Sequence, residues 1–140
     1  MTRLNTEQLQ RCRRTLEASL ERYRQAEPGS LDAEVYRNAV IKGFELSLET
    51  AGKLLRRALR EFSPTPRQVD ALVFKEVLRQ AARVDLLTPE SVSRWFLYRD
   101  SRNSTAHDYG ESLAQETLAL IDDFLVDLAA LLQALERLDV

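Results

Sequence analysis

The sequence predicts an all-α protein, in which residues 1–140 form a single domain, an antiparallel up-and-down bundle of four to five helices. Leu, Ala, Arg and Glu dominate the composition, and all four residue types favour helices. Only 4 Gly and 4 Pro are present, which leaves little material for turns. Along most of the chain, apolar residues recur at intervals of three and four, as on one face of an amphipathic helix.

Two helices are predicted in the first part of the chain. The first has one apolar face, made by Leu9, Cys12, Leu16, Leu20 and Tyr23. The sequence EPGS at 27–30 ends it, because Pro and Gly together do not continue a helix. The second helix is expected over about Leu31–Phe62, with an apolar row wide enough for burial on more than one side. Gly43 and Gly52 inside it each cost about 1 kcal/mol relative to Ala, so we expect another helix to pack closely there.

Two shorter helices should follow. Pro follows Thr in SPTPRQ (63–68) and again in LTPES (87–91), so that each Thr caps a helix whose first position is Pro. The third helix is expected to carry these residues inward: Val69, Leu72, Val73, Val77 and Leu78. A short fourth helix has its apolar side at Val92, Trp95, Phe96 and Tyr98.

The final helix, about 112–138, has the most regular pattern, with apolar positions that alternate at four and three as in a bundle seam. Further leucines widen the seam beyond what one small bundle needs, so part of it is expected to face a partner subunit. Leu128, Leu132 and Leu135 suit that contact and the core equally well.

Composition removes several functional classes. The net charge of −2 argues against a strongly basic nucleic-acid binder, and the last 70 residues are the acidic half, with 7 Lys and Arg against 12 Asp and Glu. A single Cys12 excludes an internal disulfide and fits a reducing compartment. No signal-like or membrane-spanning apolar run is present, so we expect a cytoplasmic protein with no membrane partner. The chain lacks a Gly-rich phosphate loop, enough Cys and His for zinc, and a basic recognition helix; no metal, cofactor or DNA partner is expected.

The segment YRDSRNSTAHDYG at 98–110 holds the only histidine of the chain. If the helix continued through it, Asn103 and His107 would share a face, with Arg102 beside Asn103. If the helix frayed near Ser104, a loop would fold His107 back toward Arg102. Both alternatives bring Arg102, Asn103 and His107 together. A lone histidine also has a plainer interpretation, as a partly buried ring hydrogen-bonded to a neighbour.

The string RNSTAHDY resembles the signature of the HEPN superfamily of helical bundles, many of which cleave RNA. More narrowly it resembles the HepT-like branch, also called nucleotidyltransferase substrate-binding proteins, which pair with minimal nucleotidyltransferases. The similarity runs from about residue 35 to the end, through VIKGFELSLETAGKLL (40–55), FKEVLRQAARVDLL (74–87) and the Trp-containing segment before the motif. One departure is Gly52 before Lys53, where the family often has an aromatic residue.

The resemblance implies a dimeric, metal-independent endoribonuclease that needs no cofactor and leaves 2′,3′-cyclic phosphate ends. His107 would be the general acid or base, Arg102 would stabilise the phosphate and Asn103 would orient it, at a composite site formed by two copies. A partner nucleotidyltransferase would transfer AMP to Tyr109 and silence the toxin. The second-helix pattern of Glu45, Glu49 and Lys53, together with Arg99 before the motif, would bind substrate or partner.

Three hypotheses stay open at this point. The first is a ribonuclease toxin of a toxin–antitoxin pair, and the intact motif favours it. The second is a non-catalytic subunit that binds substrate or nucleotide for the nucleotidyltransferase, which the acidic second half favours. The third is a structural bundle whose motif is a coincidence. Separately, the plainer interpretations are that Tyr109 only packs against the last helix and that the second-helix charges only pair with each other at spacing four. The RNA target and the subunit contact do not follow from the sequence.

Overall fold

The computed structural model describes the chain at residues 4–107 and 111–138, with side chains described at 4–102 and 114–138. Those residues form seven helices and no strand, which confirms the all-α prediction. The helices are α1 (Glu7–Gln25), α2 (Leu31–Phe62), α3 (Pro66–Asp70), α4 (Phe74–Arg83), α5 (Pro89–His107), α6 (Glu111–Leu118) and α7 (Ile121–Arg137). Within this part of the chain, no helix is both long and apolar enough to cross a membrane.

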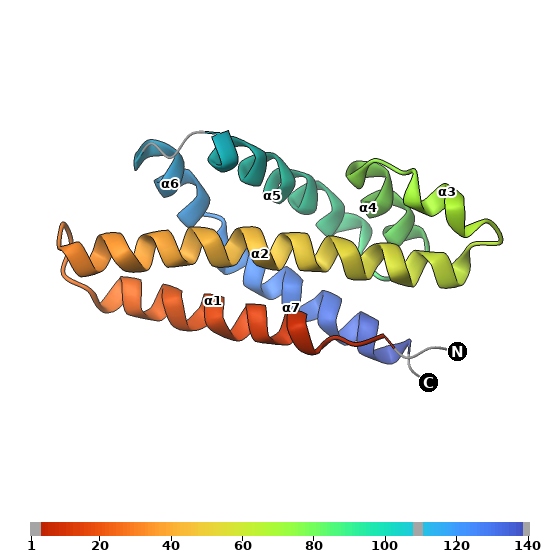
Figure 1. The fold of residues 1–140 in the computed structure, drawn as a ribbon, viewed down its shortest axis with the longest axis horizontal. Coiled ribbons are helices and arrows are strands. Elements are labelled where there is room, and N and C mark those ends of the chain that lie inside the picture. The colour runs from red at the N-terminus through yellow and green to blue at the C-terminus, as the bar shows by residue number, and fades with distance from the viewer. Residues whose placement is uncertain (1–3, 108–110, 139–140) are drawn as a thin grey trace.

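The long helix α2 is the axis around which the others pack (Figure 1). α1 runs antiparallel along one side of it, α5 lies on the opposite side, and α7 passes behind. α3 and α4 cover one end of α2, while α6 lies at the other end, beyond the last turn of α5 (Figure 1). α1 begins and α7 ends at the end of the bundle away from α6 (Figure 1). This is the expected antiparallel up-and-down arrangement.

Two helices that we predicted to be continuous are each divided in two. The third is broken at residues 71–73, and Val73, expected to point inward, is instead 71% exposed in the extended residue before α4. The final helix is broken at Ala119 and Leu120. Leu120 keeps a near-helical φ of −92° and ψ of −15°, so the apolar spacing runs across the break unchanged. Periodicity therefore predicted the correct face at Leu120 and the wrong one at Val73, and it missed both turns.

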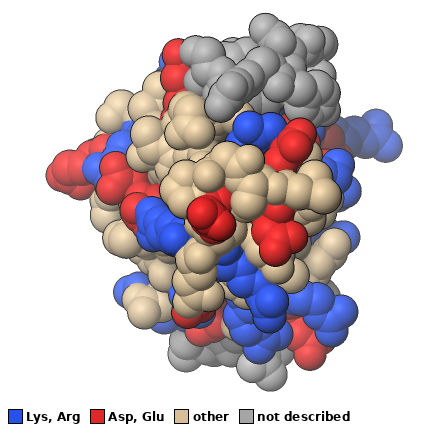
Figure 2. Space-filling model, turned by 90° about the vertical axis from the view of Figure 1, so that its left-hand side faces the viewer, with Lys and Arg blue, Asp and Glu red and all other residues tan. Residues whose placement is uncertain are grey.

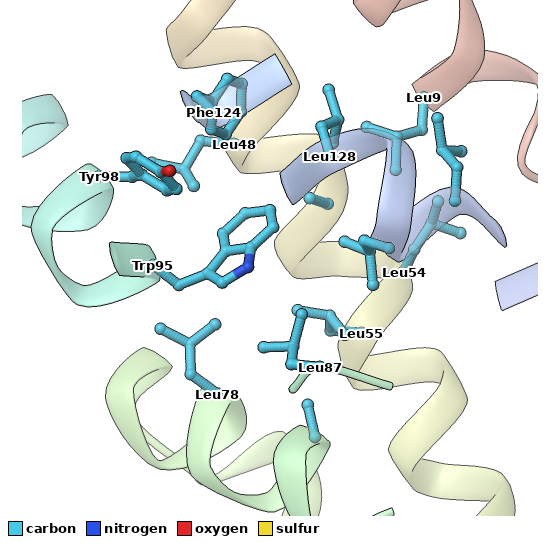
Figure 3. Close-up of a cluster of buried hydrophobic side chains, with 14 of the residues drawn as sticks. Leu9, Leu48, Leu54, Leu55, Leu78, Leu87, Trp95, Tyr98, Phe124 and Leu128 are labelled. Carbon is cyan, nitrogen blue, oxygen red and sulfur yellow. The ribbon is translucent and has the colours of Figure 1, made fainter. Parts of the chain in front are cut away.

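The core of the bundle is aromatic at its centre. Trp95 and Tyr98 of α5 are buried with Phe124 of α7 (Figure 3). Phe44 of α2 completes the group through edge-to-face contacts with Tyr98 and with Phe124, the latter at 4.9 Å between ring centroids. The leucines of α7 that suited core and subunit contact equally are core residues within one chain: Leu128, Leu132 and Leu135 are at most 4% exposed. The bundle thus buries most of the α7 seam by itself.

Candidate functional site

The first half of α5 is held against α7 by a buried carboxylate. Asp127 of α7 is 6% exposed and accepts hydrogen bonds from Nε and Nη2 of Arg94, each 2.8 Å long. The Tyr98 hydroxyl donates a third bond of 2.5 Å to it. Burial, followed by the bond to Asp127, raises the pKa of Tyr98, so the hydroxyl stays protonated and continues to donate. These bonds fix the position of α5 one turn before the motif.

The second half of α5 carries the motif on an unbroken helix. α5 extends to His107, so the alternative in which the helix frays near Ser104 is wrong. At about 100° per residue, Arg102, Asn103 and His107 fall within a sector of about 140° of the helix surface. The side chains of Asn103 and His107, and all of Tyr109, lie outside the described residues. The backbone therefore groups the three motif positions on one side of α5.

Arg102 connects the motif to α2. Its Nη2 lies 3.9 Å from Oε2 of Glu49, and the other oxygen of Glu49 lies 3.7 Å from Nζ of Lys53. The Glu49–Lys53 pair is the helical ion pair at spacing four that the sequence offered as the plainer interpretation. The structure adds Arg102 from α5, whose side chain is 27% exposed, to this cluster. Three of the predicted site residues thus meet where α2 and α5 face each other.

The remaining two candidates on these helices, Glu45 and Arg99, also border other parts of the surface. Glu45, one turn earlier on α2, lines a groove of about 490 Å³ together with Arg37 and Lys42. Arg99 lies on the α4 side of α5, with its Cζ 4.9 Å from the ring centroid of Phe74. Glu45 thus also borders a groove on α2, and Arg99 also contacts α4.

The departure at Gly52 has a structural explanation. A Cβ atom at residue 52 would lie 2.5 Å from Cε2 of Phe74, a separation that real Cβ atoms essentially never show. Glycine therefore leaves the space in which α4 inserts its own aromatic ring against α2. At Gly43 the close neighbour is Leu16 of α1, whose Cδ1 would be 3.3 Å from a Cβ. Both glycines mark close helix packing, as predicted.

Residues 4–137 match the protein-family model described as "Nucleotidyltransferase substrate binding protein like". The chain belongs to this family. It is the same group that the motif and the second helix resemble in the sequence. The match covers nearly all of the described chain.

Two individual proteins support the assignment to the nucleotidyltransferase substrate-binding-like family. The chain is 36% identical over 97 residues to a protein of Haemophilus influenzae named "Probable ribonuclease HepT". That alignment covers 69% of this chain and 65% of the relative, so the chain spans somewhat less than two thirds of the relative's length. A solved structure from the same organism, described as the fold of a substrate binding domain of a nucleotidyltransferase, has a TM-score of 0.82 and 29% identity. It covers 94% of this chain and 98% of that one.

Sequence reasoning missed three residues that shape this site: Phe74, Asp127 and Arg56. Arg56 of α2 donates a 3.1 Å hydrogen bond to the backbone oxygen of Val69, and its charge acts on Arg99. Asp127 left a signal, since it is a charged residue three positions after Phe124 and four before Leu131, on the buried side of α7. Phe74 and Arg56 left none, because their importance comes from the meeting of α2, α4 and α5. A contact between helices that are distant in the sequence has no local pattern.

Proposed function

We propose that this chain is the partner of a minimal nucleotidyltransferase and a metal-independent endoribonuclease, the toxin of a toxin–antitoxin pair in the cytoplasm. Family membership supports the partner role. The relative named as a probable ribonuclease supports the catalytic role. The observation that carries the proposal is the unbroken α5, which groups Arg102, Asn103 and His107 on one side of a helix fixed to the core.

The residue types suit cleavage by an internal nucleophile. The 2′-hydroxyl of a ribose attacks the neighbouring phosphorus, the bond from phosphorus to the 5′-oxygen breaks, and a 2′,3′-cyclic phosphate forms. A histidine, which titrates near neutral pH, takes the proton of the 2′-hydroxyl or gives one to the leaving 5′-oxygen. Arg102 stabilises the charge that develops on the phosphate, and Asn103 orients it. A homodimer supplies two copies of His107, one for each proton transfer.

The proposed control of this activity is AMP transfer. The hydroxyl of Tyr109 attacks the α-phosphorus of ATP bound to the nucleotidyltransferase, and pyrophosphate leaves. The product carries a nucleotide and a negative phosphate two residues from His107. Both its bulk and its charge oppose RNA at the motif.

The first test is cleavage of a labelled single-stranded RNA in EDTA by the wild type, His107→Ala and Arg11→Gln. Arg11 is exposed on α1, on the other side of α2 from α5 (Figure 1). We expect 2′,3′-cyclic ends from the wild type and the Arg11 variant, and a loss of about 10²-fold or more without the general acid–base group. Equal cleavage by wild type and His107→Ala, or cleavage only after metal addition, would contradict the proposal.

A separate test concerns Tyr109. The purified chain is incubated with its nucleotidyltransferase and ATP labelled at the α-phosphate, beside Tyr109→Phe. We expect label on the wild type, none on the variant, and loss of cleavage in proportion to labelling. Labelling of the Phe variant would show that Tyr109 is not the acceptor.

A second candidate function, nucleotide binding without catalysis, has one specific observation in its favour. A cavity of about 680 Å³ opens between the α1–α2 turn and α6, lined among others by Tyr23, Arg24, Arg37 and Gln115. Nε of Arg37 is buried and has no hydrogen-bond partner in the described part of the chain. Figure 2, which looks onto this end of the molecule, shows Lys and Arg mixed with Asp and Glu rather than one basic field. Calorimetric binding of ATP that Arg37→Gln abolishes, with no cleavage of RNA, would favour this candidate.

A further inference from the structure

Aromatic rings and cations alternate along the surface where α4 packs on α5. Cζ of Arg99 lies 4.9 Å from the ring centroid of Phe74. One turn earlier on α5, the ring of Phe96 has Nζ of Lys75 at 5.5 Å and Cζ of Arg79 at 5.2 Å from its centroid. We name this surface, with Arg56 of α2, the α4–α5 strip: Arg56, Phe74, Lys75, Arg79, Phe96 and Arg99.

The two ends of the α4–α5 strip differ in charge. Lys75 pairs with Asp100 at 3.5 Å, and Arg79 pairs with Glu76 at 3.1 Å. Among the described residues, neither Arg56 nor Arg99 has a salt bridge; Arg56 instead donates to the backbone oxygen of Val69 at 3.1 Å. Positive charge therefore remains at the end of the strip nearest Arg102.

At the end of the strip nearest Arg102, the positive charges of several arginines act on one another. Burial first, then the nearby charges of Arg102 and Arg56, lower the pKa of Arg99. The charges of Arg56 and Arg102 both oppose that of Arg99. Among the described ion pairs of these three arginines, Glu49 pairs only with Arg102, so an anion bound beside Arg99 would stabilise this end of the strip. Arg is also the side chain that binds phosphate through two parallel hydrogen bonds.

We propose that the α4–α5 strip binds the backbone of single-stranded RNA and leads it to the motif on α5. This inference rests on the proposed ribonuclease function, because it takes RNA as the ligand. Arg99 and His107 are eight residues apart on one helix, or about 12 Å along its axis. Alternating rings and guanidinium planes fit bases and phosphates of a single strand. An acidic protein surface would need the charges but not the rings, so RNA is the occupant that the strip fits better.

The test separates binding from cleavage. The probe is a fluorescein-labelled single-stranded RNA whose 2′-hydroxyls are methylated, so that it lacks the nucleophile, and binding is followed by anisotropy over a range of salt concentrations. Arg99→Gln and Arg56→Gln should each weaken binding several-fold and reduce the slope of log K against log salt concentration by about one. Lys75→Gln, at a side chain 46% exposed, tests the strip without risk to folding. Arg11→Gln is the matched control on α1 and should bind as the wild type does.

Each outcome decides the proposal. The assignment of the strip to RNA is wrong if all three variants bind the RNA as tightly as the wild type does: Arg99→Gln, Arg56→Gln and Lys75→Gln. That result would not affect the test of His107-dependent cleavage. Binding that depends on the strip, with no cleavage of unmodified RNA, supports the strip and contradicts the ribonuclease function. Variants that keep RNA binding but lose association with the purified nucleotidyltransferase would make the strip a protein contact and overturn its assignment to RNA.

Discussion

The N-terminal half of α5 is part of the core, whereas its C-terminal half carries the polar motif, although both belong to one helix. In the first half, Trp95 and Tyr98 are at most 1% exposed, and Asp127 of α7 holds Arg94 and Tyr98. In the second half, Arg102 reaches Glu49 over 3.9 Å at a partly exposed position. Packing in the core therefore holds the first half of α5, whereas an ion pair joins the second half to α2.

This division shows how a small bundle positions a polar site. A site on a helix is placed as accurately as the packing that holds the helix. Near the junction, the hydroxyls of Ser101 and Thr117 lie 3.1 Å apart and connect α5 to α6. Substitutions in the two halves should therefore separate stability from activity.

The largest expected effect on stability is at Trp95. Trp95→Ala should lower the free energy of unfolding by about 3–5 kcal/mol, because it leaves a cavity among the rings of the core. Chemical denaturation followed by circular dichroism measures this loss. Trp95→Phe keeps a ring and should lose much less, while Arg102→Gln should stay within about 0.5 kcal/mol of the wild type. A large loss for Arg102→Gln would contradict the division of α5.

Asp127 should give the next largest effect. Asp127→Ala leaves the buried Tyr98 hydroxyl without its acceptor, whereas the head group of Arg94, whose side chain is 44% exposed, can turn to water. We expect a loss of about 2 kcal/mol.

The Tyr98 hydroxyl provides the control for this prediction. Tyr98→Phe should cost about 1 kcal/mol in the wild type and less in the Asp127→Ala background, where the hydroxyl has no partner to lose. Additive losses in the double variant would mean that the two groups do not interact.

The sequence predicts the buried core of the bundle in a different way from the motif-bearing half of α5. Apolar spacing predicted α1, α2 and the buried side of α7, because burial repeats with the helical period. It did not predict the breaks near Val73 and Leu120. Val73 is exposed and so departs from the apolar spacing, whereas Leu120 keeps a near-helical backbone and so preserves that spacing. The motif positions were found from their order along the chain, since Arg102, Asn103 and His107 lie within two turns. The contact of Arg99 with Phe74 brings α5 against α4, and only packing shows it.

Gly52 tests the packing of α4 on α2, through the Phe74 ring that also contacts Arg99 of α5. Gly52→Ala adds a methyl group 2.5 Å from Phe74, so the gain in helix propensity should be outweighed and stability should fall by about 1–2 kcal/mol. Gly43→Ala is the matched control: its methyl group would lie 3.3 Å from Cδ1 of Leu16, which can shift slightly, and 3.6 Å from Cα and Cβ of that residue, which is ordinary contact, so the change should be neutral or slightly stabilising. Thermal unfolding of both variants measures the difference. Equal effects would show that the Phe74 ring moves aside easily, and Phe74→Leu should then fail to rescue Gly52→Ala.

The smallest expected effect concerns the other acidic residues of α7, which contrast with buried Asp127. Asp122 pairs with Arg24 of α1 at 2.6 Å, and this hydrogen bond holds the pKa of Asp122 below its usual value. A carboxyl group whose pKa is lower in the folded state adds stability above its unfolded pKa and loses it as pH falls through the folded pKa. Both side chains are more than half exposed, so solvent screening limits the contribution to a few tenths of a kcal/mol at neutral pH. Asp122→Asn should therefore lower the melting temperature slightly at pH 7, and the difference from the wild type should disappear as the pH falls through the lowered pKa of folded Asp122. A difference that persists in acid would mean that Asp122 stabilises the α1–α7 contact by packing rather than by charge.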